Sequence, residues 1–435
     1  MLKKFLLFCC LLFLALSVWA QTDDDDEEGE NAAIEAPAQE EEQIQGGKKK
    51  SGIKNRTFEL SLVNVNVNVT NDFIAAKDIF QETAVINLDD FLSGFRLDAR
   101  LAIRPLSLNF NWKDKWGFGF DIAHIDVFGN VSLSENLINL NEVNDDKFGI
   151  GAAVFADFAV PVFFHADDFR IKIRPAVYLP LFYTEPGIIF NNSGDRLSVK
   201  YDMRIYSVLN LNEIFGDDPD SLQNTFSAEN IENILKNNLG FDLGLGVEYP
   251  LYSWLDLGVD IFNLPFAAAR LNHYMRLHGE AYFDSSKIDI ADLVDGGEIP
   301  EDAYGYPEDF EPEYLYDSSG RELFRPFKML FYANYRPFDT GILTLIPSLG
   351  FSISNLYAEI GSIEAGIAAR CDLGNIFIIT LGTGYFDRNW KHSLDFVLNF
   401  RALELDIGVS VQSPDFVKSF QGAGAGVNFG IKLGW

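Results

Sequence analysis

The sequence predicts an all-β protein, a transmembrane antiparallel β-barrel of about 14 strands, within a range of about 12 to 16. Three features of the chain lead to this fold class. It opens with an export signal, most of its length alternates apolar and polar residues, and its final strand ends on an aromatic residue. A short helical segment near the N-terminus and a disordered acidic linker complete the predicted fold.

The first 20 residues have the pattern of a signal peptide. Lys3 and Lys4 precede an unbroken apolar run, and the small residue Ala20 marks the expected cleavage site. The uncharged stretch 5–19 is shorter than the roughly 20 apolar residues that a membrane-spanning helix needs. We therefore expect residues 1–20 to be removed after export. No later stretch approaches that length, so any membrane crossing is expected to be made by strands.

Acidic charge gathers in residues 21–56 and dominates the whole chain. This segment opens with acids at every position from 23 to 28, and it lacks apolar periodicity. It cannot bury enough apolar surface to fold, so we expect a disordered periplasmic linker. In total, 34 basic residues stand against 64 acidic ones, which gives a net charge of −30. Such a charge excludes nucleic acid as a partner.

Residues 57–435 are predicted to form the barrel, because apolar residues recur at every second position in segments bounded by turn residues. Valines alternate with asparagines in residues 63–69, and aliphatic residues alternate with acidic or small ones in residues 403–411. Each strand therefore has one apolar and one polar face. The candidate strands are 58–69, 95–112, 116–128, 147–160, 168–182, 196–209, 240–249, 254–263, 269–283, 325–336, 341–353, 359–371, 375–386, 389–400, 403–412 and 422–435.

The same alternation also fits a water-soluble sandwich, so the last strand decides between the two folds. Apolar residues stand at alternate positions up to the aromatic final residue: Val427, Phe429, Ile431, Leu433 and Trp435. This strand resembles the C-terminal strand of outer-membrane barrels in general, which the barrel assembly machinery recognises. The resemblance implies a location in the outer membrane of a Gram-negative-type envelope, with outer-membrane lipid and the assembly machinery as partners.

Two segments lack the strand pattern. Residues 71–92 have helix-like spacing and are expected to plug the lumen or to cap its periplasmic mouth. Residues 285–325 form a long acidic loop, which is expected to be extracellular. Counting strands back from a periplasmic C-terminus places the 210–239 connection inside and the 250–253 turn outside. Because longer connections usually face outward, this result indicates a miscounted strand in that region.

Basic residues gather on the polar faces of several strands, mostly in the N-terminal half, where they are expected to line the lumen. One hypothesis is a cationic wall that attracts anionic solutes or the head group of an anionic amphiphile. The alternative is structural: the basic side chains pair with Asp98, Asp202 and Glu280, link strands and fill a narrow bore. The members of this basic wall are Arg96, Arg100, Arg104, Arg170, Lys172, Arg174, Arg204 and Arg276.

The sequence carries no enzyme motif. It contains no Gly-x-Ser-x-Gly, no Cys-x-x-Cys and no phosphate loop, and its histidines are scattered without ligand spacing. We therefore predict that the protein is not an enzyme and has no catalytic residue, metal site or cofactor. Only Cys371 remains after the predicted cleavage, so no internal disulfide is expected.

The general layout of the chain resembles the fatty-acid-transporter type of outer-membrane barrel. The resemblance is carried by the 71–92 segment ahead of the main strands, the Asp-Leu-Gly strand starts at Asp242 and Asp256, and the terminal Trp435. It implies a narrow tube with an N-terminal plug that passes hydrophobic molecules sideways into the membrane. The acidic linker departs from that family and no ligand motif is present, so no binding residue carries over.

These observations favour an outer-membrane channel or transporter for small molecules, either hydrophobic or anionic and amphipathic. Two alternatives stay open. One is a surface interaction protein or adhesin that displays the 285–325 loop on its barrel. The other is a structural barrel that its acidic linker tethers to a periplasmic partner.

The terminal strand generates a prediction about assembly. Replacing Trp435 with Ala, or deleting Gly434 and Trp435, is expected to reduce membrane insertion, because the assembly machinery would lose the end of its recognition strand. The measurement is the yield of heat-modifiable protein in the membrane fraction. An unchanged yield and an unchanged electrophoretic shift would contradict the barrel assignment.

Overall fold

The structure is a computed structural model that describes most of the predicted barrel. The described residues are 56–71, 95–112, 115–133, 144–166, 169–185, 187–192, 196–215, 227–287, 300, 303–305, 312–338, 340–353, 361–400 and 402–434. The predicted signal peptide, all but the end of the linker, the predicted plug beyond Asn71 and the terminal Trp435 lie outside the described residues.

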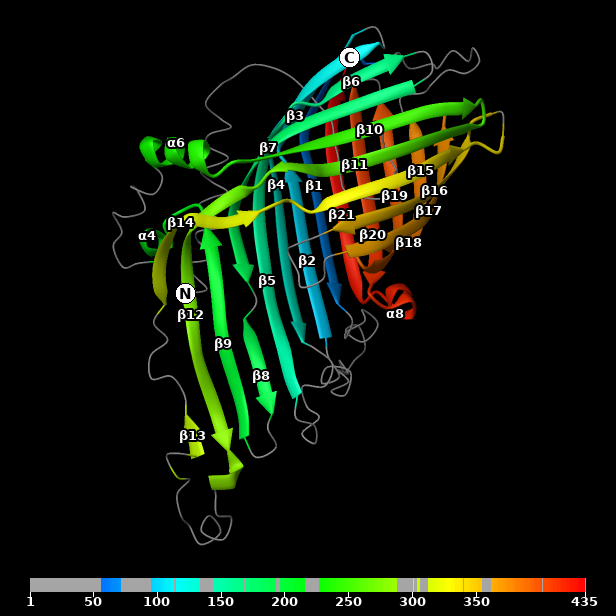
Figure 1. The fold of residues 1–435 in the computed structure, drawn as a ribbon. Coiled ribbons are helices and arrows are strands. Elements are labelled where there is room, and N and C mark those ends of the chain that lie inside the picture. Colours follow the sequence, from blue (N-terminus) through cyan, green and yellow to red (C-terminus); the bar gives the residue numbers. More distant parts are fainter. Residues whose placement is uncertain are drawn as a thin grey trace.

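The described strands form one antiparallel sheet that closes on itself as a ring of 14 strands (Figure 1). Closure is made by the first and last strands, which pair from Glu59↔Gly434 to Thr70↔Gly424. The predicted count of about 14 is thus confirmed. In ring order the strands are β1 (Phe58–Asn71), β2 (Phe95–Arg104) continued by β3 (Leu106–Trp112), β4 (Trp116–Leu133), β5 (Asn144–Ala159) continued by β6 (Val162–Ala166), β7 (Phe169–Glu185), β10 (Gly240–Tyr252), β11 (Leu255–Ala267), β15 (Phe327–Tyr335), β16 (Leu343–Ile353), β17 (Gly361–Leu373), β18 (Phe377–Phe386), β19 (Asn389–Phe400), β20 (Leu403–Ser413) and β21 (Gly424–Gly434).

Two of the candidate strands leave the ring and build a wall that we call the extension. The last residues of β7 turn away from β10 and pair with β9 (Arg196–Ser207). Next come β12 (Ala269–Asp284) and β14 (Glu313–Leu323), while β8 (Ile188–Asn192) joins β5 to β9. Figure 1 shows this extension at the lower left, reaching beyond the ring, with the short β13 (Tyr304–Gly305) on its outer part.

The extension corrects the predicted sidedness of two connections. Because β10 starts at the end of the ring where β7 finishes, the described parts of the 210–239 connection lie there too, with the extension and the described parts of residues 285–325. The 250–253 turn lies at the end of Gly434. Short turns gather at the Gly434 end, which identifies it as periplasmic. The predicted sidedness was wrong here because β9 and β12 alternate like barrel strands and were counted as part of the ring.

Helices are few and short in the described part of the chain. They are α4 (Leu211–Phe215), α6 (Ala228–Asn237) and α8 (Phe416–Phe420), with a 3-10 turn at Ser285–Lys287. None is long and apolar enough to span a membrane. α8 follows the extracellular end of β20, and α4 and α6 lie in the chain between β9 and the extracellular start of β10.

Burial follows the alternation of the strands. On β20, Ile407 and Val409 are 45% and 50% exposed on the outer face, whereas Asp406 and Ser410 are 2% and 9% exposed on the inner face. The same contrast recurs on β16 and β21. A water-soluble barrel would hide its apolar face, so this outer surface requires lipid around it. The protein is therefore an outer-membrane β-barrel, as the sequence predicted.

The lipid-facing surface generates a stability prediction on β16. Leu349 points outward and is 57% exposed, while its neighbour Ser348 points inward. Replacing Leu349 with Arg is expected to cost about 2–4 kcal/mol if the site lies near the bilayer midplane. Ser348→Arg is the matched control and should cost less, because the inner face is polar. Urea unfolding in lipid vesicles measures both costs, and a larger loss at Ser348 would contradict the orientation.

Candidate functional site

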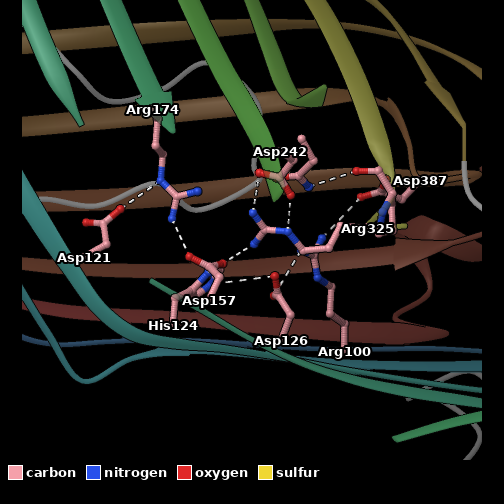
Figure 2. A network of polar contacts seen from close by, with 11 residues as sticks. Arg100, Asp121, His124, Asp126, Asp157, Arg174, Asp242, Arg325 and Asp387 are labelled. Atoms are coloured by element: carbon pink, nitrogen blue, oxygen red, sulfur yellow. Dashed lines mark hydrogen bonds and ion pairs between the residues drawn. The ribbon is translucent and has the colours of Figure 1, made fainter. Parts of the chain in front are cut away.

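Charged side chains from strands far apart in the sequence meet inside the barrel, and Figure 2 shows them in contact. We call this set the ion network. Its members come from β2, β4, β5, β7, β10 and the segment that leads into β15: Arg100, Asp121, His124, Asp126, Asp157, Arg174, Asp242 and Arg325. The arrangement is possible because the strand positions all lie on the inner face of the sheet and Arg325 reaches them from the segment before β15.

Arg325 is the centre of the ion network. Its Nε and Nη2 each donate to a different oxygen of Asp242 at 2.7 Å, which makes a bidentate pair. Its Nη1 donates to Asp157 on the other side, and its guanidinium lies 5.1 Å from the centre of the Tyr178 ring. The Arg325 side chain is 3% exposed. One cation thus joins β10 to β5 in a site shielded from solvent.

Arg174 extends the network along β7. Its Nε donates to Asp121 and its Nη2 to Asp157, both at 2.8 Å. Asp157 therefore meets two guanidinium groups, and His124 Nδ1 lies 2.9 Å from its second oxygen. Asp157 is 2% exposed, so its charge depends on these partners rather than on water.

A β-bulge on β4 brings its three network residues to the same face. The register with β5 shifts between Asp121 and His124, and Ala123 between them has a φ of 55°, in the left-handed region. In a regular strand, residues 121 and 124 would face opposite sides of the sheet. The extra residue turns His124 and Asp126 inward beside Asp121, at the cost of a strained alanine.

A second group of ion pairs connects the ion network to β15 and β17 on the opposite side of the barrel. Arg100 lies 3.4 Å from Asp126 and 3.9 Å from Asp387, which sits in the tight turn between β18 and β19. Lys328 on β15 lies 3.9 Å from Asp387 and 2.7 Å from Glu364 on β17. Asp387 has a φ of 48° and Arg388 a φ of 66°, the conformation of a type I′ hairpin turn. Paired charges therefore cross the barrel interior from β2 and β4 to β15 and β17.

The periplasmic end holds a separate charged cluster. Arg56 Nη1 lies 3.2 Å from Glu404, and its Nη2 donates to Asn399 at 2.7 Å. Lys432 on the last strand lies 3.0 Å from the other oxygen of Glu404. These side chains are 6–14% exposed. Ion pairs thus join neighbouring strands on the inner face at this level as well.

Aromatic side chains line the inner surface where the ring meets the extension. Phe155 packs edge-on against Phe128 and Tyr178, with ring centroids 6.2 and 6.3 Å apart. Tyr206 bridges Tyr183 and Tyr274 at 6.2 and 5.5 Å. We call these six residues the aromatic cluster. It adjoins the ion network through Tyr178, so a mostly buried apolar cluster lies on the extracellular side of the charges.

The structure places the members of the predicted basic wall in several environments. Arg100 and Arg174 belong to the ion network, Arg104 is buried in the ring, and Arg96 pairs with Asp98. Arg170 lies 3.7 Å from Glu248, and Lys172 lies 5.3 Å from the centre of the Phe163 ring.

Arg204 and Arg276 are a correction, because they lie on the extension rather than in the ring of strands. Both contact Asp202, at 3.5 and 2.7 Å, and the hydrogen bond from Arg276 lowers the pKa of that carboxyl. They share the inward face of the extension with Tyr206, which pairs with the inward Tyr183 of β7. The sequence pattern placed these residues on the polar face of their strands, but it assigned those strands to the ring instead of to the extension.

Sequence reasoning missed the most buried members of the ion network. Asp157 stands alone in an apolar strand, and Arg325 follows the acidic loop, so neither belongs to a row of charges. The segment from Asp121 to Asp126 carries three polar residues, but regular alternation splits them between two faces. Among the described residues, no group of three or more His, Cys, Asp or Glu is arranged to hold a metal ion.

Comparisons with known proteins find a likeness in fold. No family model matches the chain, and no curated protein matches its sequence. Among solved structures, the toluene transporter TodX of P. putida is 8% identical with a TM-score of 0.43, and the match covers 87% of this chain and 89% of TodX. The toluene transporter TbuX of Ralstonia pickettii is 8% identical with a TM-score of 0.40, over 87% and 89%. The monoaromatic hydrocarbon channel CymD is 9% identical with a TM-score of 0.40, over 88% and 89%. Values this low describe a general likeness between barrels and carry no conclusion about a solute.

The ion network generates a prediction about stability. Arg325→Gln is expected to cost about 3–5 kcal/mol of unfolding free energy, because it leaves Asp157 and Asp242 buried with a cation removed. Adding Asp242→Asn should recover part of the loss, since one uncompensated charge disappears. The control is Arg270→Gln, whose pair with Glu322 is more than half exposed and should contribute about 0–1 kcal/mol. Equal losses for Arg325→Gln and Arg270→Gln would contradict the assigned role.

Proposed function

We propose that the protein is an outer-membrane channel or transporter for small hydrophobic or amphipathic molecules. The observation that carries this proposal is the ion network, which places paired, buried charges inside the ring. A general diffusion porin needs a wide water-filled lumen, and such a lumen would leave these side chains hydrated. The described interior is better suited to restricting ions than to conducting them.

The aromatic cluster gives the proposal its solute class. Phe155, Tyr178, Tyr183 and Tyr206 are at most 9% exposed and form packed core next to the ion network. The half-buried rings of Phe128 and Tyr274 are the ones that an apolar molecule arriving from outside could contact. Burying a small apolar molecule against such rings is favourable by roughly 25 cal/mol per Å² of apolar surface. TodX and TbuX are toluene transporters and CymD is a monoaromatic hydrocarbon channel, so the solutes of those proteins belong to the class proposed here.

Transport can be separated from the interaction and structural alternatives by two measurements on the full mature chain. We expect low single-channel conductance in a planar bilayer. We also expect intact cells that make the protein to take up a labelled small aromatic faster than cells without it, because the lipopolysaccharide leaflet slows such solutes. A large, steady conductance would indicate a general porin. Neither conductance nor faster uptake would favour a display or structural role.

The predicted basic wall remains part of the proposal for amphipathic solutes. Arg170 and Lys172 lie on β7 toward its periplasmic end, where an anionic head group could meet them. Replacing both with Gln is expected to slow uptake of an anionic amphiphile, more at low salt, while leaving uptake of a neutral aromatic unchanged. Equal loss for both solutes, or a fall in melting temperature with unchanged selectivity, would favour a purely structural role.

A further inference from the structure

The helix α8 is a rigid element on the extracellular rim. Asp415 caps its N-terminus by accepting hydrogen bonds from the backbone N–H groups of Val417 and Lys418, both at 2.8 Å. Gly422, with a φ of 74°, ends the turn that follows it, and the backbone N–H of Ala423 donates to Lys418 at 3.3 Å. The helix is thus fixed at both ends between β20 and β21, and its side chains have defined positions.

The helix packs against the outer face of the barrel. Trp390 and His392 of β19 lie opposite Tyr385 and Thr383 of the neighbouring β18. Alternation puts all four on the face opposite the buried Asp395. Phe420 stacks on His392 with centroids 3.9 Å apart. Phe416 packs against Trp390 at 4.8 Å. The side chains that seat α8 are therefore on the lipid side of the sheet, and Figure 1 shows the helix at the ends of the last strands.

Polar contacts of the His392 ring hold α8 in this position against β19. Its Nδ1 lies 2.8 Å from Thr383 Oγ1, and its Nε2 lies 3.0 Å from Ser419 Oγ. Ser419 Oγ in turn donates to the carbonyl of Phe416 at 2.6 Å. These bonds hold α8 against β19, with one side of Phe416 and Phe420 packed on the sheet.

Three large apolar side chains of α8 have about half or more of their surface exposed. Phe416, Val417 and Phe420 are 48%, 61% and 63% exposed. Toward the periplasm on the same outer face, Leu381 and Val409 are 57% and 50% exposed in the lipid-facing band. The apolar surface of α8 therefore continues that band to the extracellular rim.

We propose that α8 lies in the outer leaflet of the membrane, at the boundary between acyl chains and head groups, and anchors the rim of β18, β19 and β20 at that depth. Lipid is the occupant of its exposed face, because that face is continuous with the surface that lipid already covers. Aromatic residues favour this boundary, where apolar rings and polar groups are both accommodated. The proposal depends on the barrel spanning the membrane and is independent of the transported solute.

Spin labelling of the full mature chain in lipid vesicles tests the proposal. In a Cys371→Ser background, a nitroxide is attached at Val417→Cys, with Leu381→Cys as the lipid reference and Lys200→Cys on the extension as the aqueous reference. Collision with oxygen and with a water-soluble nickel complex then reports the depth of each label. The proposal expects the Val417 label to be more accessible to oxygen than to nickel, and to lie shallower than the Leu381 label.

Two results would overturn the assignment. A Val417 label that collides mainly with nickel, as the Lys200 label should, would place α8 in water. Dipolar broadening at Val417 that disappears on dilution with unlabelled protein would mean that a second copy of the chain covers the helix. Measuring Phe420→Cys in the same way guards against a local effect of one label, and both positions must agree for the proposal to stand.

Discussion

Arg325, held between Asp157 and Asp242, is the interaction on which the barrel interior depends. Each of these side chains is nearly inaccessible to water, so each charge is tolerable only with its partners in place. Through Asp157 the same contact extends to Arg174 and His124, and through Asp126 and Arg100 toward the far wall. Strands that are distant in sequence must therefore keep one register and one curvature, because a shift of one residue would turn a buried charge toward lipid.

The extension follows from the way β7 divides its pairing. Its first part continues the ring with β10, and its last residues start a second branch with β9. The aromatic cluster fills the space where the two branches separate. The Tyr178 hydroxyl lies 3.1 and 3.0 Å from the carbonyl oxygens of Ala267 and Leu323, which share its single proton. Arg325 follows β14 directly, so the chain returns from the extension to the ring at the ion network. The ion pairs of Arg325 and the packing of the aromatic cluster thus both stabilise the point where the extension joins the ring.

Much of the fold could be predicted because lipid imposes a simple rule on strands. Positions such as Val427 and Phe429 had to alternate with polar residues, and the strand ranges and their count followed from that pattern. The departure of β9 and β12 from the ring could not be predicted, because their alternation resembles that of the barrel strands. Partner choice depends on contacts such as Tyr183 with Tyr206, which join residues that no local pattern relates.

The candidate site was predicted only in part, for a physical reason. Arg100 and Arg174 stood in visible rows of basic residues on polar faces. The bulge at Ala123 breaks the alternation that would have assigned His124, and Arg325 precedes its strand rather than lying in it. Buried networks draw single residues from many strands, so no short motif marks them.

An experimental structure of the mature protein in a lipid bilayer, at a resolution that shows ordered water, tests the central claim most directly. The account predicts the Arg325 guanidinium in bidentate contact with Asp242 and in contact with Asp157, with no continuous column of water passing between them. An Arg325 side chain turned into an open, water-filled lumen would contradict it.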